Sequence, residues 1–369
     1  MKIIQIIYSL SSGGAERFVV DLSNELANMG HDVTVCMLLE DNNTRLTFNK
    51  KFINNNVKFH AMNFDKGFSI HKSDLLQAYI KKENPDIVHC HLNVIPYVFR
   101  LCLFYRHIKF FHTLHSIAEY TFDSKLQYYF NKFYYKLNLI RPICISKLCQ
   151  KSYEDLYNLF NAPVINNGRA MPVVSNKFLA VKKEVECLKK NTTSPVFIHV
   201  ARFSPEKNQQ MLIDSFNALF EEGIDFVLLV IGSGYDSETG KQLQKQACKN
   251  VYFLCEKDNV CDYMLCADAF CLTSNYEGLS ITLLEALACG LTPICTSVGG
   301  IPDVIEDDIT GYLSPNQNVG LYVKNLKRFM TRPLNKDYLI NYYKENYSMD
   351  ICAKKYEKEY IKSTCCKNN

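Results

Sequence analysis

Two glutamates in the second half of the chain have a spacing suited to holding a polar ligand. Glu277 and Glu285 lie within residues 274–286, a segment that follows an apolar run, turns at a glycine and enters a helical pattern. The residues of the turn would present free backbone N–H groups at a helix N-terminus, a favourable position for a phosphate group. These residues are Gly278, Leu279 and Ser280.

The two carboxylates are expected to serve different parts of one ligand. Glu285 lies among leucines and alanines, where a carboxylate needs a partner, and a ligand hydroxyl would be one. The alternative is that Glu277 only caps the helix and that Glu285 is a solvated helix charge.

Two basic residues form the second candidate group. Arg202 and Lys207 lie between a predicted strand and a helix that Pro205 opens. A guanidinium binds a diphosphate as a bidentate fork and an ammonium binds it as a point charge, so the pair is suited to clamping a diphosphate. Two basic residues in a surface loop are common and by themselves indicate little. The position of this pair, in the first strand–helix unit of a second domain, is what supports a binding role.

Alternating strand and helix patterns predict the elements that hold these residues. The sequence predicts a strand over residues 2–8, a helix over 15–29 and a strand over 31–39. A Gly13-Gly14 turn follows the first strand, and Gly30 is expected to end the helix in a left-handed conformation. Further strands are expected at 57–62, 87–90, 110–114, 141–145, 196–201, 226–231, 251–254, 269–272 and 292–296. Such alternation predicts parallel sheets covered by helices, with ligands at the carboxyl ends of the strands.

The same pattern divides the chain into four segments. We expect a Rossmann-like domain over 1–170, a polar linker over 171–194, a second Rossmann-like domain over 195–345 and a C-terminal helix or tail over 346–369. The predicted fold class is therefore α/β, with two doubly wound domains facing a central cleft.

The composition is that of a globular chain with more than one domain. Its 369 residues exceed the roughly 250 at which a single core stops growing, and 47% hydrophobic with 22% charged residues excludes a disordered chain. No run resembles a spanning helix or a signal peptide, so a cytoplasmic location is expected.

The 16 cysteines form no C-x-x-C pair and are expected to be buried thiols. No metal site is expected, because His89-Cys90-His91 has no second ligand pair at metal spacing.

The charges are unevenly divided between the two halves. Residues 1–185 hold 23 Lys and Arg against 15 Asp and Glu, a balance of +8, and the remaining residues hold 19 against 23, a balance of −4. The basic residues are dispersed, which argues against nucleic acid and fits an anionic membrane surface or a phosphorylated acceptor.

Residues 125–137 have the pattern of a basic amphipathic helix. The apolar stripe consists of Leu126, Tyr129, Phe130, Phe133 and Leu137, and the lysines at its margin are Lys125, Lys132 and Lys136. Such a helix can lie in a membrane interface, and our hypothesis is peripheral attachment to the inner face of the plasma membrane. The alternative is a helix whose stripe covers the sheet while its lysines extend to solvent.

Taken together, these residues resemble the retaining GT-B glycosyltransferases of family 4, and the resemblance covers nearly the whole chain. Its N-terminal part lies in Ser12-Gly13-Gly14-Ala15-Glu16-Arg17 and Gly30-His31-Asp32-Val33. Its C-terminal part is Glu277-x7-Glu285, followed by Ala286-Leu287-Ala288-Cys289-Gly290, Pro293 and Gly299-Gly300.

The resemblance implies retaining transfer of a sugar from a nucleoside-diphosphate sugar, a UDP-sugar above all, to a saccharide or lipid-linked glycan in cell-surface polysaccharide synthesis. It implies that Glu277 contacts the sugar hydroxyls, Glu285 the ribose, and that Arg202 and Lys207 neutralise the departing pyrophosphate. No metal or other cofactor is then needed, and no D-x-D pattern occurs in the sequence. The Gly13-Gly14 turn would let the backbone approach the donor closely.

His115 matches a family histidine that reaches the donor sugar, and it does so better than His112. The alternative is that either is a packed histidine bonded to a backbone carbonyl. The chain departs from the family at Ser116 and Asp303, where Asp and Glu are common, which leaves fine positioning of the donor open.

Other functions were weighed against transfer. A nicotinamide dehydrogenase is disfavoured because the G-x-G-x-x-G spacing is missing at Gly13-Gly14. A sugar-nucleotide epimerase of the same architecture and a non-catalytic sugar-nucleotide-binding protein stay as alternatives.

Overall fold

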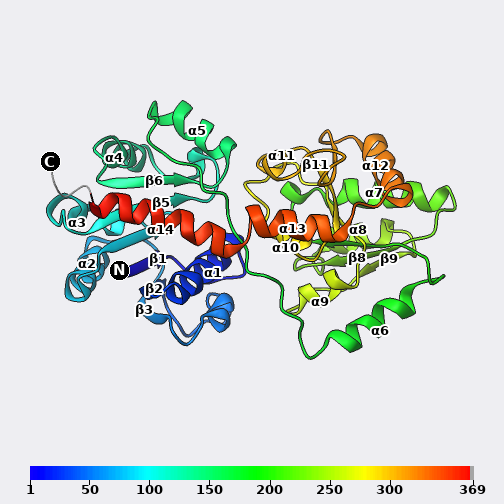
Figure 1. Cartoon of the computed structure of the whole chain (residues 1–369), viewed down its shortest axis with the longest axis horizontal. Helices are drawn as coiled ribbons and strands as arrows, with labels where there is room; N and C mark the ends of the chain where they lie inside the picture. Colours follow the sequence, from blue (N-terminus) through cyan, green and yellow to red (C-terminus); the bar gives the residue numbers. More distant parts are fainter. Residues whose placement is uncertain (366–369) are drawn as a thin grey trace. The chain divides into compact units, whose positions relative to one another are not determined.

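The computed structural model describes residues 1–365 and divides the chain into two compact units (Figure 1). The first unit contains residues 1–170 and the C-terminal segment from Tyr347, and the second contains residues 171–346. Each unit is built on one six-stranded sheet whose paired strands are parallel. The predicted fold class, two doubly wound α/β domains, is confirmed.

The first sheet has the strand order β3-β2-β1-β4-β5-β6. Its strands are β1 (Lys2–Ile7), β2 (Asp32–Leu39), β3 (Lys58–Phe64), β4 (Ile87–His91), β5 (Lys109–Leu114) and β6 (Ile140–Cys144). The helices of this unit are α1 (Gly14–Asn28), α2 (Ile70–Glu83), α3 (Phe99–Phe104), α4 (Lys125–Lys136), α5 (Lys147–Tyr157) and α14 (Met349–Cys365), with short 3-10 turns η1 (Phe48–Phe52), η2 (Ile95–Tyr97) and η3 (Ala118–Tyr120). The chain order reverses between β1 and β4, and ligands of doubly wound sheets bind at such a point.

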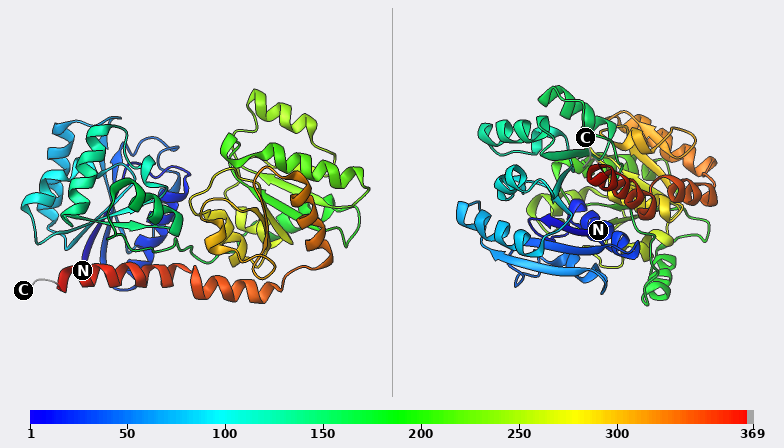
Figure 2. Two further views of the ribbon diagram at one scale, coloured as in Figure 1. Left: turned by 90° about the horizontal axis from the view of Figure 1, so that it is seen from above. Right: turned by 60° about the vertical axis from the view of Figure 1, so that its left-hand side comes forward.

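Helices α1 and α14 lie side by side on one face of the first sheet (Figures 1 and 2). The apolar stripe of α1 brings Phe18 into a core that also contains Ile3 of β1 and the rings of Tyr356 and Tyr360 from α14. Helix α1 is followed by the predicted left-handed glycine, since Gly30 has a φ of +90°. The C-terminal segment is therefore part of the core of the first unit.

The second sheet has the strand order β12-β11-β10-β7-β8-β9. Its strands are β7 (Val196–Val200), β8 (Val227–Ile231), β9 (Val251–Phe253), β10 (Ala269–Leu272), β11 (Thr292–Thr296) and β12 (Tyr312–Ser314). The helices are α6 (Phe178–Leu188), η4 (Pro205–Lys207), α7 (Gln209–Glu221), α8 (Glu238–Gln246), α9 (Val260–Leu265), α10 (Ile281–Ala288), α11 (Ile301–Val304), α12 (Val319–Thr331) and α13 (Lys336–Asn346). Helices α7 and α12 share one core with this sheet, where Phe197 packs between Phe216 and Phe329.

Several elements differ from the sequence expectations. Strand β12 was not expected, and the segment from Tyr347, expected to be a separate tail, belongs to the first unit. The segment 171–194, expected to be a linker, contains helix α6, whose Val181 and Val185 are buried. The helix expected to begin at Pro205 is interrupted at Asn208, which has a φ of 47° and separates η4 from α7. A left-handed residue cannot continue a right-handed helix, so the chain turns at this point.

The cysteines from Cys36 to Cys352 are free. Several are buried in strands, among them Cys36, Cys90 and Cys271, and burial raises the pKa of Cys36 to about 12. The buried cysteines are therefore small apolar packing groups, as expected from sequence, whereas Cys187 and Cys255 are exposed and depart from that expectation. Within residues 1–365, no helix combines the length and apolar character that a membrane span requires.

A buried ion pair joins α1 to the last residues of the N-terminal segment of the first unit. Arg169 pairs with Asp21, and their side chains are only 8% and 3% exposed. Asp21 also accepts a hydrogen bond from Arg17 Nε at 3.0 Å. The backbone of Arg169 is bonded to the neighbouring segment, because its N–H donates to the carbonyl of Tyr347 at 2.9 Å and its carbonyl accepts from Met349 at 3.0 Å.

We predict that Asp21→Asn lowers the free energy of local opening of α1 by about 3 kcal/mol, because the buried guanidinium of Arg169 then loses the charge of this carboxylate. Hydrogen exchange of the α1 amides measures this opening. The matched control is Asp32→Asn, which breaks an ion pair with Lys58 whose side chains are 64% and 45% exposed and should cost less than about 1 kcal/mol. Equal effects of the two substitutions would contradict the role given to the buried pair.

Candidate active site

Lys207 and Glu277 lie together in the second unit. Glu277 is buried on the loop after β10, where its carboxylate pairs with the ammonium of Lys207 and accepts a hydrogen bond from Ser274 Oγ at 2.7 Å. Lys207 is on the loop after β7, and β7 and β10 are neighbours in the sheet. The structure therefore brings these two predicted residues to one place, at the carboxyl ends of adjacent strands.

The loops that carry Lys207 and Glu277 are held to each other by hydrogen bonds. The backbone N–H of Asn275 donates to the carbonyl of Glu206 at 2.8 Å, and its side-chain amide donates to the carbonyl of Pro205 at 3.0 Å. The left-handed Asn208 adds a bond from its own amide to Asn275 Oδ1 at 3.2 Å, and its Oδ1 caps α7. Sequence reasoning missed both asparagines, although Asn is favoured at left-handed positions and at helix N-caps.

Gly299 allows a second segment to pack against the backbone of Glu277. A Cβ atom at Gly299 would lie 1.7 Å from the carbonyl oxygen of Glu277, and Gly299 has a left-handed φ of +58°. The next residue, Gly300, donates its N–H to the carbonyl of Gly278 at 2.7 Å. The paired glycines therefore fix the turn that precedes α10.

Helix α10 begins directly after this turn, with Ser280 as its N-cap residue. Among residues 1–365, the backbone N–H groups of Gly278, Leu279 and Ser280 have no hydrogen-bond acceptor. Free N–H groups at a helix N-terminus attract anions. Glu285 lies one turn into α10, where it is half-buried and interacts with neighbouring groups of the protein.

Arg202 is exposed on the loop after β7, and a hydrogen bond from a neighbouring helix holds its backbone. Gln209 donates its side-chain amide to the carbonyl of Arg202 at 2.9 Å and also contacts Nε2 of the buried His199. Burial lowers the pKa of His199 to about 4, so its ring is neutral and Nδ1–H donates to the carbonyl of Cys271 at 2.9 Å. Sequence reasoning missed this support because it joins three separate segments.

The Gly13-Gly14 turn lies in the first unit, at the start of α1. Gly13 is the N-cap residue, and the side chain of Glu16 folds back over it, because a Cβ atom at Gly13 would lie 2.1 Å from Glu16 Oε2. Ser11 Oγ donates to the other carboxylate oxygen at 2.8 Å. Gly13 therefore leaves space for a carboxylate that stabilises the first turn of α1.

His115 also lies in the first unit, one residue beyond β5. Its Nε2 is 3.0 Å from His91 Nδ1, and its ring meets that of Phe18 edge-on at 5.5 Å. Burial, with a smaller contribution from His112, lowers the pKa of His115 to about 3, so the ring is neutral at physiological pH. Within residues 1–365, His115 Nδ1 is buried and has no hydrogen-bond partner.

His112 points to the opposite face of the first sheet and has both ring nitrogens occupied. Its Nε2 lies 2.9 Å from the carbonyl of Leu92, and its Nδ1 lies 2.6 Å from the hydroxyl of Tyr135. This is the arrangement of a packed histidine, and the difference between the two histidines agrees with the preference for His115.

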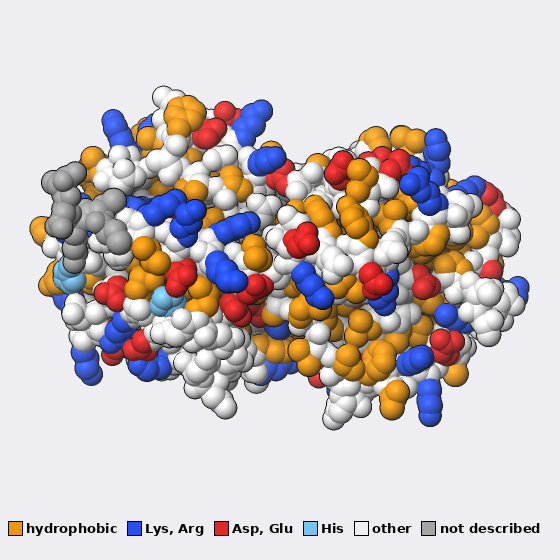
Figure 3. Space-filling model, viewed as in Figure 1, with side chains coloured by type: hydrophobic (Ala, Val, Ile, Leu, Met, Phe, Trp, Pro, Cys, Tyr) orange, Lys and Arg blue, Asp and Glu red, His pale blue; other side chains and the backbone are white. Residues whose placement is uncertain are grey.

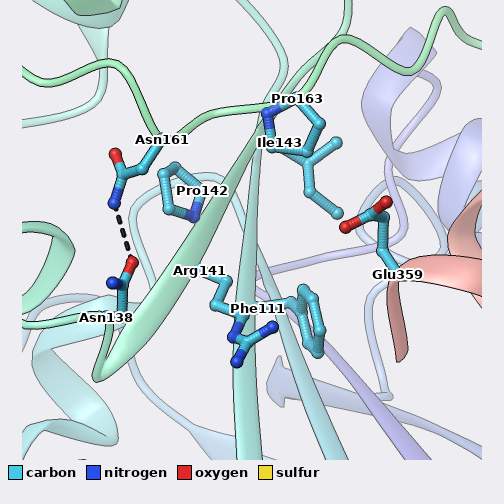
Figure 4. A pocket seen from close by; sticks show the side chains of 8 residues that line it. All are labelled: Phe111, Asn138, Arg141, Pro142, Ile143, Asn161, Pro163 and Glu359. Atoms are coloured by element: carbon cyan, nitrogen blue, oxygen red, sulfur yellow. Dashed lines mark hydrogen bonds between the residues drawn. The ribbon is translucent and has the colours of Figure 1, made fainter. Parts of the chain in front are cut away.

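A cavity of about 230 Å³ in the first unit lies away from these residues (Figure 4). It is lined by Phe111, Asn138, Arg141, Pro142, Ile143, Asn161, Pro163 and Glu359. Asn138 and Arg141 lie at the amino end of β6, whereas Gly13 and His115 follow the carboxyl ends of β1 and β5. The cavity is therefore separate from the predicted site.

Potential metal ligands of the described residues do not gather into a site. Among residues 1–365, no group of three or more His, Cys, Asp and Glu side chains has the arrangement of a metal site. His89 and His91 share a face of the sheet, with ring centroids 4.1 Å apart, and both ring nitrogens of each are hydrogen-bonded within the protein.

Comparison with known proteins relates this geometry to a family. The family model for glycosyl transferases group 1 matches residues 181–346, and the model for glycosyltransferase family 4 matches residues 12–169. The chain belongs to the GT-B glycosyltransferases of group 1 and family 4.

Individual relatives of this glycosyltransferase agree with the assignment. The chain is 28% identical over 327 residues to the N-acetyl-alpha-D-glucosaminyl L-malate synthase of Bacillus anthracis, covering 82% of this chain and 81% of the relative. It is 25% identical over 275 residues to the UDP-Gal:alpha-D-GlcNAc-diphosphoundecaprenol alpha-1,3-galactosyltransferase of Escherichia coli, covering 69% and 68%. The structure of Anabaena HepE in complex with UDP and glucose has the same fold, with a TM-score of 0.77, 15% identity, and coverage of 98% and 100%.

The two units of the glycosyltransferase hold different predicted site residues. Lys207, Glu277, Arg202 and the first turn of α10 gather in the second unit, whereas the Gly13-Gly14 turn and His115 gather in the first. Each group lies at the carboxyl ends of its own sheet.

We predict that Gly299→Ala destabilises the second unit by about 2 kcal/mol or more, because the new methyl group overlaps the Glu277 carbonyl and the backbone is left-handed. Calorimetry should show a lowered Tm. Gly320→Ala in α12 is the matched control, since the nearest atom to its Cβ is 3.8 Å away, and it should leave Tm unchanged or raise it slightly. A normal Tm for Gly299→Ala would show that the turn before α10 is not tightly packed.

Proposed function

We propose that this glycosyltransferase moves a sugar from a nucleoside-diphosphate sugar to a saccharide or lipid-linked glycan with retention of configuration, and without a metal ion. The observation that carries the proposal is the pairing of Lys207 with the buried Glu277 beside the free N–H groups that open α10. A cation, a carboxylate and a helix N-terminus in one place suit a ligand that has both phosphates and sugar hydroxyls.

Each residue has a distinct task in this proposal. Lys207 and Arg202 neutralise the diphosphate as it leaves, and the N–H groups of Gly278, Leu279 and Ser280 add hydrogen bonds to it. Glu277 accepts hydrogen bonds from the transferred sugar, and Glu285 accepts them from the ribose. The contacts of Lys207 and Arg202 with the diphosphate strengthen as negative charge develops on the leaving oxygen, so they lower the activation barrier for transfer.

The proposed step is a displacement on one face of the sugar. The bond between the anomeric carbon and the diphosphate oxygen breaks, and its electron pair stays on that oxygen. The acceptor oxygen bonds to the anomeric carbon from the same side, and its proton passes to the diphosphate oxygen. No protein nucleophile is required, and metal ions are replaced by the two cationic side chains.

A UDP-sugar is the proposed donor. The Escherichia coli relative has UDP-Gal in its name, and the Anabaena structure of the same fold holds UDP and glucose. Family membership favours transfer over epimerisation and over binding without turnover. The proposed setting is cell-surface polysaccharide synthesis.

We predict that Glu285→Ala, Arg202→Ala and Lys207→Ala each lower kcat/KM more than tenfold, because each removes a charge-assisted contact of about 1.5–3 kcal/mol. Turnover of an isotope-labelled UDP-sugar, chosen by thermal stabilisation from a panel of UDP-, GDP- and ADP-sugars, provides the measurement. Lys241→Ala is the control, since Lys241 is exposed on α8 in the same unit, and its rate should be normal.

Normal rates in all three variants would contradict the site assignment. NMR spectra of the same reactions give the anomeric configuration of the product. An inverted linkage would contradict the displacement on one face, an epimerised free donor would indicate the epimerase, and binding without product would indicate a sensor.

The exposed face of α4 supports a lipid-linked acceptor and membrane contact as part of the proposal. The five apolar residues of the predicted stripe are 45% to 67% exposed, whereas Asn131, Tyr134 and Tyr135 face the protein. The interpretation in which the stripe covers the sheet is therefore wrong, because the tyrosine hydroxyls take the inner positions by bonding to Phe99 and His112. Lysine and arginine side chains are spread over the face of the first unit that Figure 3 shows.

An apolar stripe bordered by lysines matches an anionic bilayer surface. The charge of the first unit agrees, because residues 1–170 and 347–369 hold 25 Lys and Arg against 17 Asp and Glu, a balance of +8. The name of the Escherichia coli relative includes a diphosphoundecaprenol-linked sugar, and such an acceptor lies in a membrane.

We predict that the full chain floats with vesicles containing phosphatidylglycerol and that Leu126→Ser weakens this binding about fivefold or more, because Leu126 loses its burial in the interface. Leu321→Ser on α12 is the matched control, an exposed leucine of the second unit that should have no effect. Binding that is indifferent to lipid charge, to salt and to Leu126→Ser would contradict membrane contact through α4.

A further inference from the structure

Three neighbouring strands of the first unit align a chain of buried side chains that ends at His115. Gln5 of β1, His91 of β4 and His115 after β5 lie on the same face of the sheet as α1 and α14. Gln5 Oε1 is 2.7 Å from His91 Nε2, and His91 Nδ1 is 3.0 Å from His115 Nε2. Gln5 and His91 are completely buried.

The direction of the hydrogen bonds in this chain follows from the chemistry of its first member. With the Gln5 amide oriented as in the structure, Oε1 faces His91 and can only accept, so His91 Nε2 carries a proton and donates it, while Gln5 Nε2 is buried without a partner among residues 1–365. Burial, with the neighbouring His89, holds the pKa of His91 well below its usual range, so the ring has one proton and its Nδ1 is an acceptor. His115 Nε2–H therefore donates to His91 Nδ1, and the neutral His115 keeps a bare Nδ1.

His115 differs from its neighbours in this bare nitrogen. His89, His91 and His112 have both ring nitrogens hydrogen-bonded, whereas His115 Nδ1 has no partner among residues 1–365. A buried acceptor without a partner costs free energy that a bound hydroxyl would recover. The other three are packed histidines, and His115 is the one of the four with a ring nitrogen that no group of residues 1–365 satisfies.

Neighbouring side chains hold the hydrogen-bonded series from Gln5 to His115 in a fixed position. The ring of His91 lies 4.1 Å from that of His89, which is fixed by Tyr360 OH at 2.7 Å and Thr113 Oγ1 at 2.8 Å. Phe18 of α1 meets both His91 and His115 edge-on, at 6.4 and 5.5 Å. Neither imidazole can rotate without disturbing these contacts, so the tautomer of His91 is transmitted to His115.

We infer that Gln5 and His91 are positioning residues that fix His115 as the Nε2–H tautomer, so that its Nδ1 accepts a hydrogen bond from a substrate hydroxyl. The inference rests on the proposed sugar transfer for the identity of that hydroxyl. The tautomer itself is a property of the protein without substrate. Reversing the Gln5 amide would reverse every bond in the chain and place the proton on His115 Nδ1, so the tautomer decides between the two arrangements.

The test is a two-dimensional 1H–15N spectrum of the full chain labelled at the histidine rings, without substrate at neutral pH. We expect His115 to have a protonated Nε2 and an unprotonated Nδ1. A protonated Nδ1, or a mixture of tautomers, in the unaltered protein would overturn the inference, and this outcome requires no variant to fold.

Two variants then connect the tautomer to catalysis. Gln5→Met removes the acceptor with little change in shape, and His91→Phe removes the bond to His115 while keeping an aromatic ring in the same layer. Both should give mixed His115 tautomers and lower kcat/KM roughly threefold to tenfold, the effect of one hydrogen bond. His112→Gln is the matched control, since His112 lies on β5, the strand that precedes His115, and this substitution should preserve both the His115 tautomer and kcat/KM.

The outcomes separate this inference from the proposed function. A loss of kcat/KM in Gln5→Met and His91→Phe with an unchanged His115 tautomer would overturn the positioning role and leave sugar transfer intact. Failure of every UDP-sugar to react would contradict the proposed function, and the measured tautomer would stand.

Discussion

The ion pair between Lys207 and Glu277 is the interaction on which the candidate site of the second unit depends. A carboxylate that is buried as deeply as that of Glu277 is costly unless a cation and hydrogen bonds compensate it, and Lys207 and Ser274 do so. Because the two partners come from different loops, the pair also fixes the distance between those loops. The backbone bonds of Asn275 and the close packing of Gly299 then follow from the same constraint.

The first unit reaches rigidity in another way. Its sheet carries a row of neutral polar side chains through an apolar layer, and hydrogen bonds between neighbours rather than charges compensate most of their polar atoms, with Gln5 Nε2 and His115 Nδ1 left unpaired among residues 1–365. The phenol groups of α14 supply part of this compensation, since Tyr360 bonds His89 and Tyr356 bonds Thr113 at 3.0 Å. Buried networks of this kind tolerate little rearrangement, because any broken bond leaves an unpaired polar atom in a medium of low dielectric constant.

The parts of the structure set by local pattern were predictable from sequence, and those set by strand order were not. The strand, helix and left-handed glycine of residues 2–39 follow from periodicity and from Gly30. The partnership of Lys207 with Glu277 needed β7 and β10 to be neighbours, and the line from Gln5 to His115 needed the order β1-β4-β5. Sequence distance contains no such information, so the residues were predictable as candidates and their contacts were not.

Helix α4 illustrates a second limit. Periodicity identified its apolar stripe correctly but not the direction in which the stripe faces, because Tyr134 and Tyr135 are both large and able to bond and therefore compete for the inner positions. A hydrophobicity pattern alone ranks such tyrosines below phenylalanine and leucine, whereas burial with a hydrogen-bond partner favours them.

The return of the chain to the first unit has a consequence for how the protein is made. A ribosome releases the N-terminal 170 residues long before it has translated α14, so Phe18 and the histidines of β4 have no covering tyrosines during that interval. The second unit, which is continuous in sequence, can finish folding while the first still waits for its last helix. Completion of the first unit's core therefore depends on a segment that is translated after the whole of the second unit.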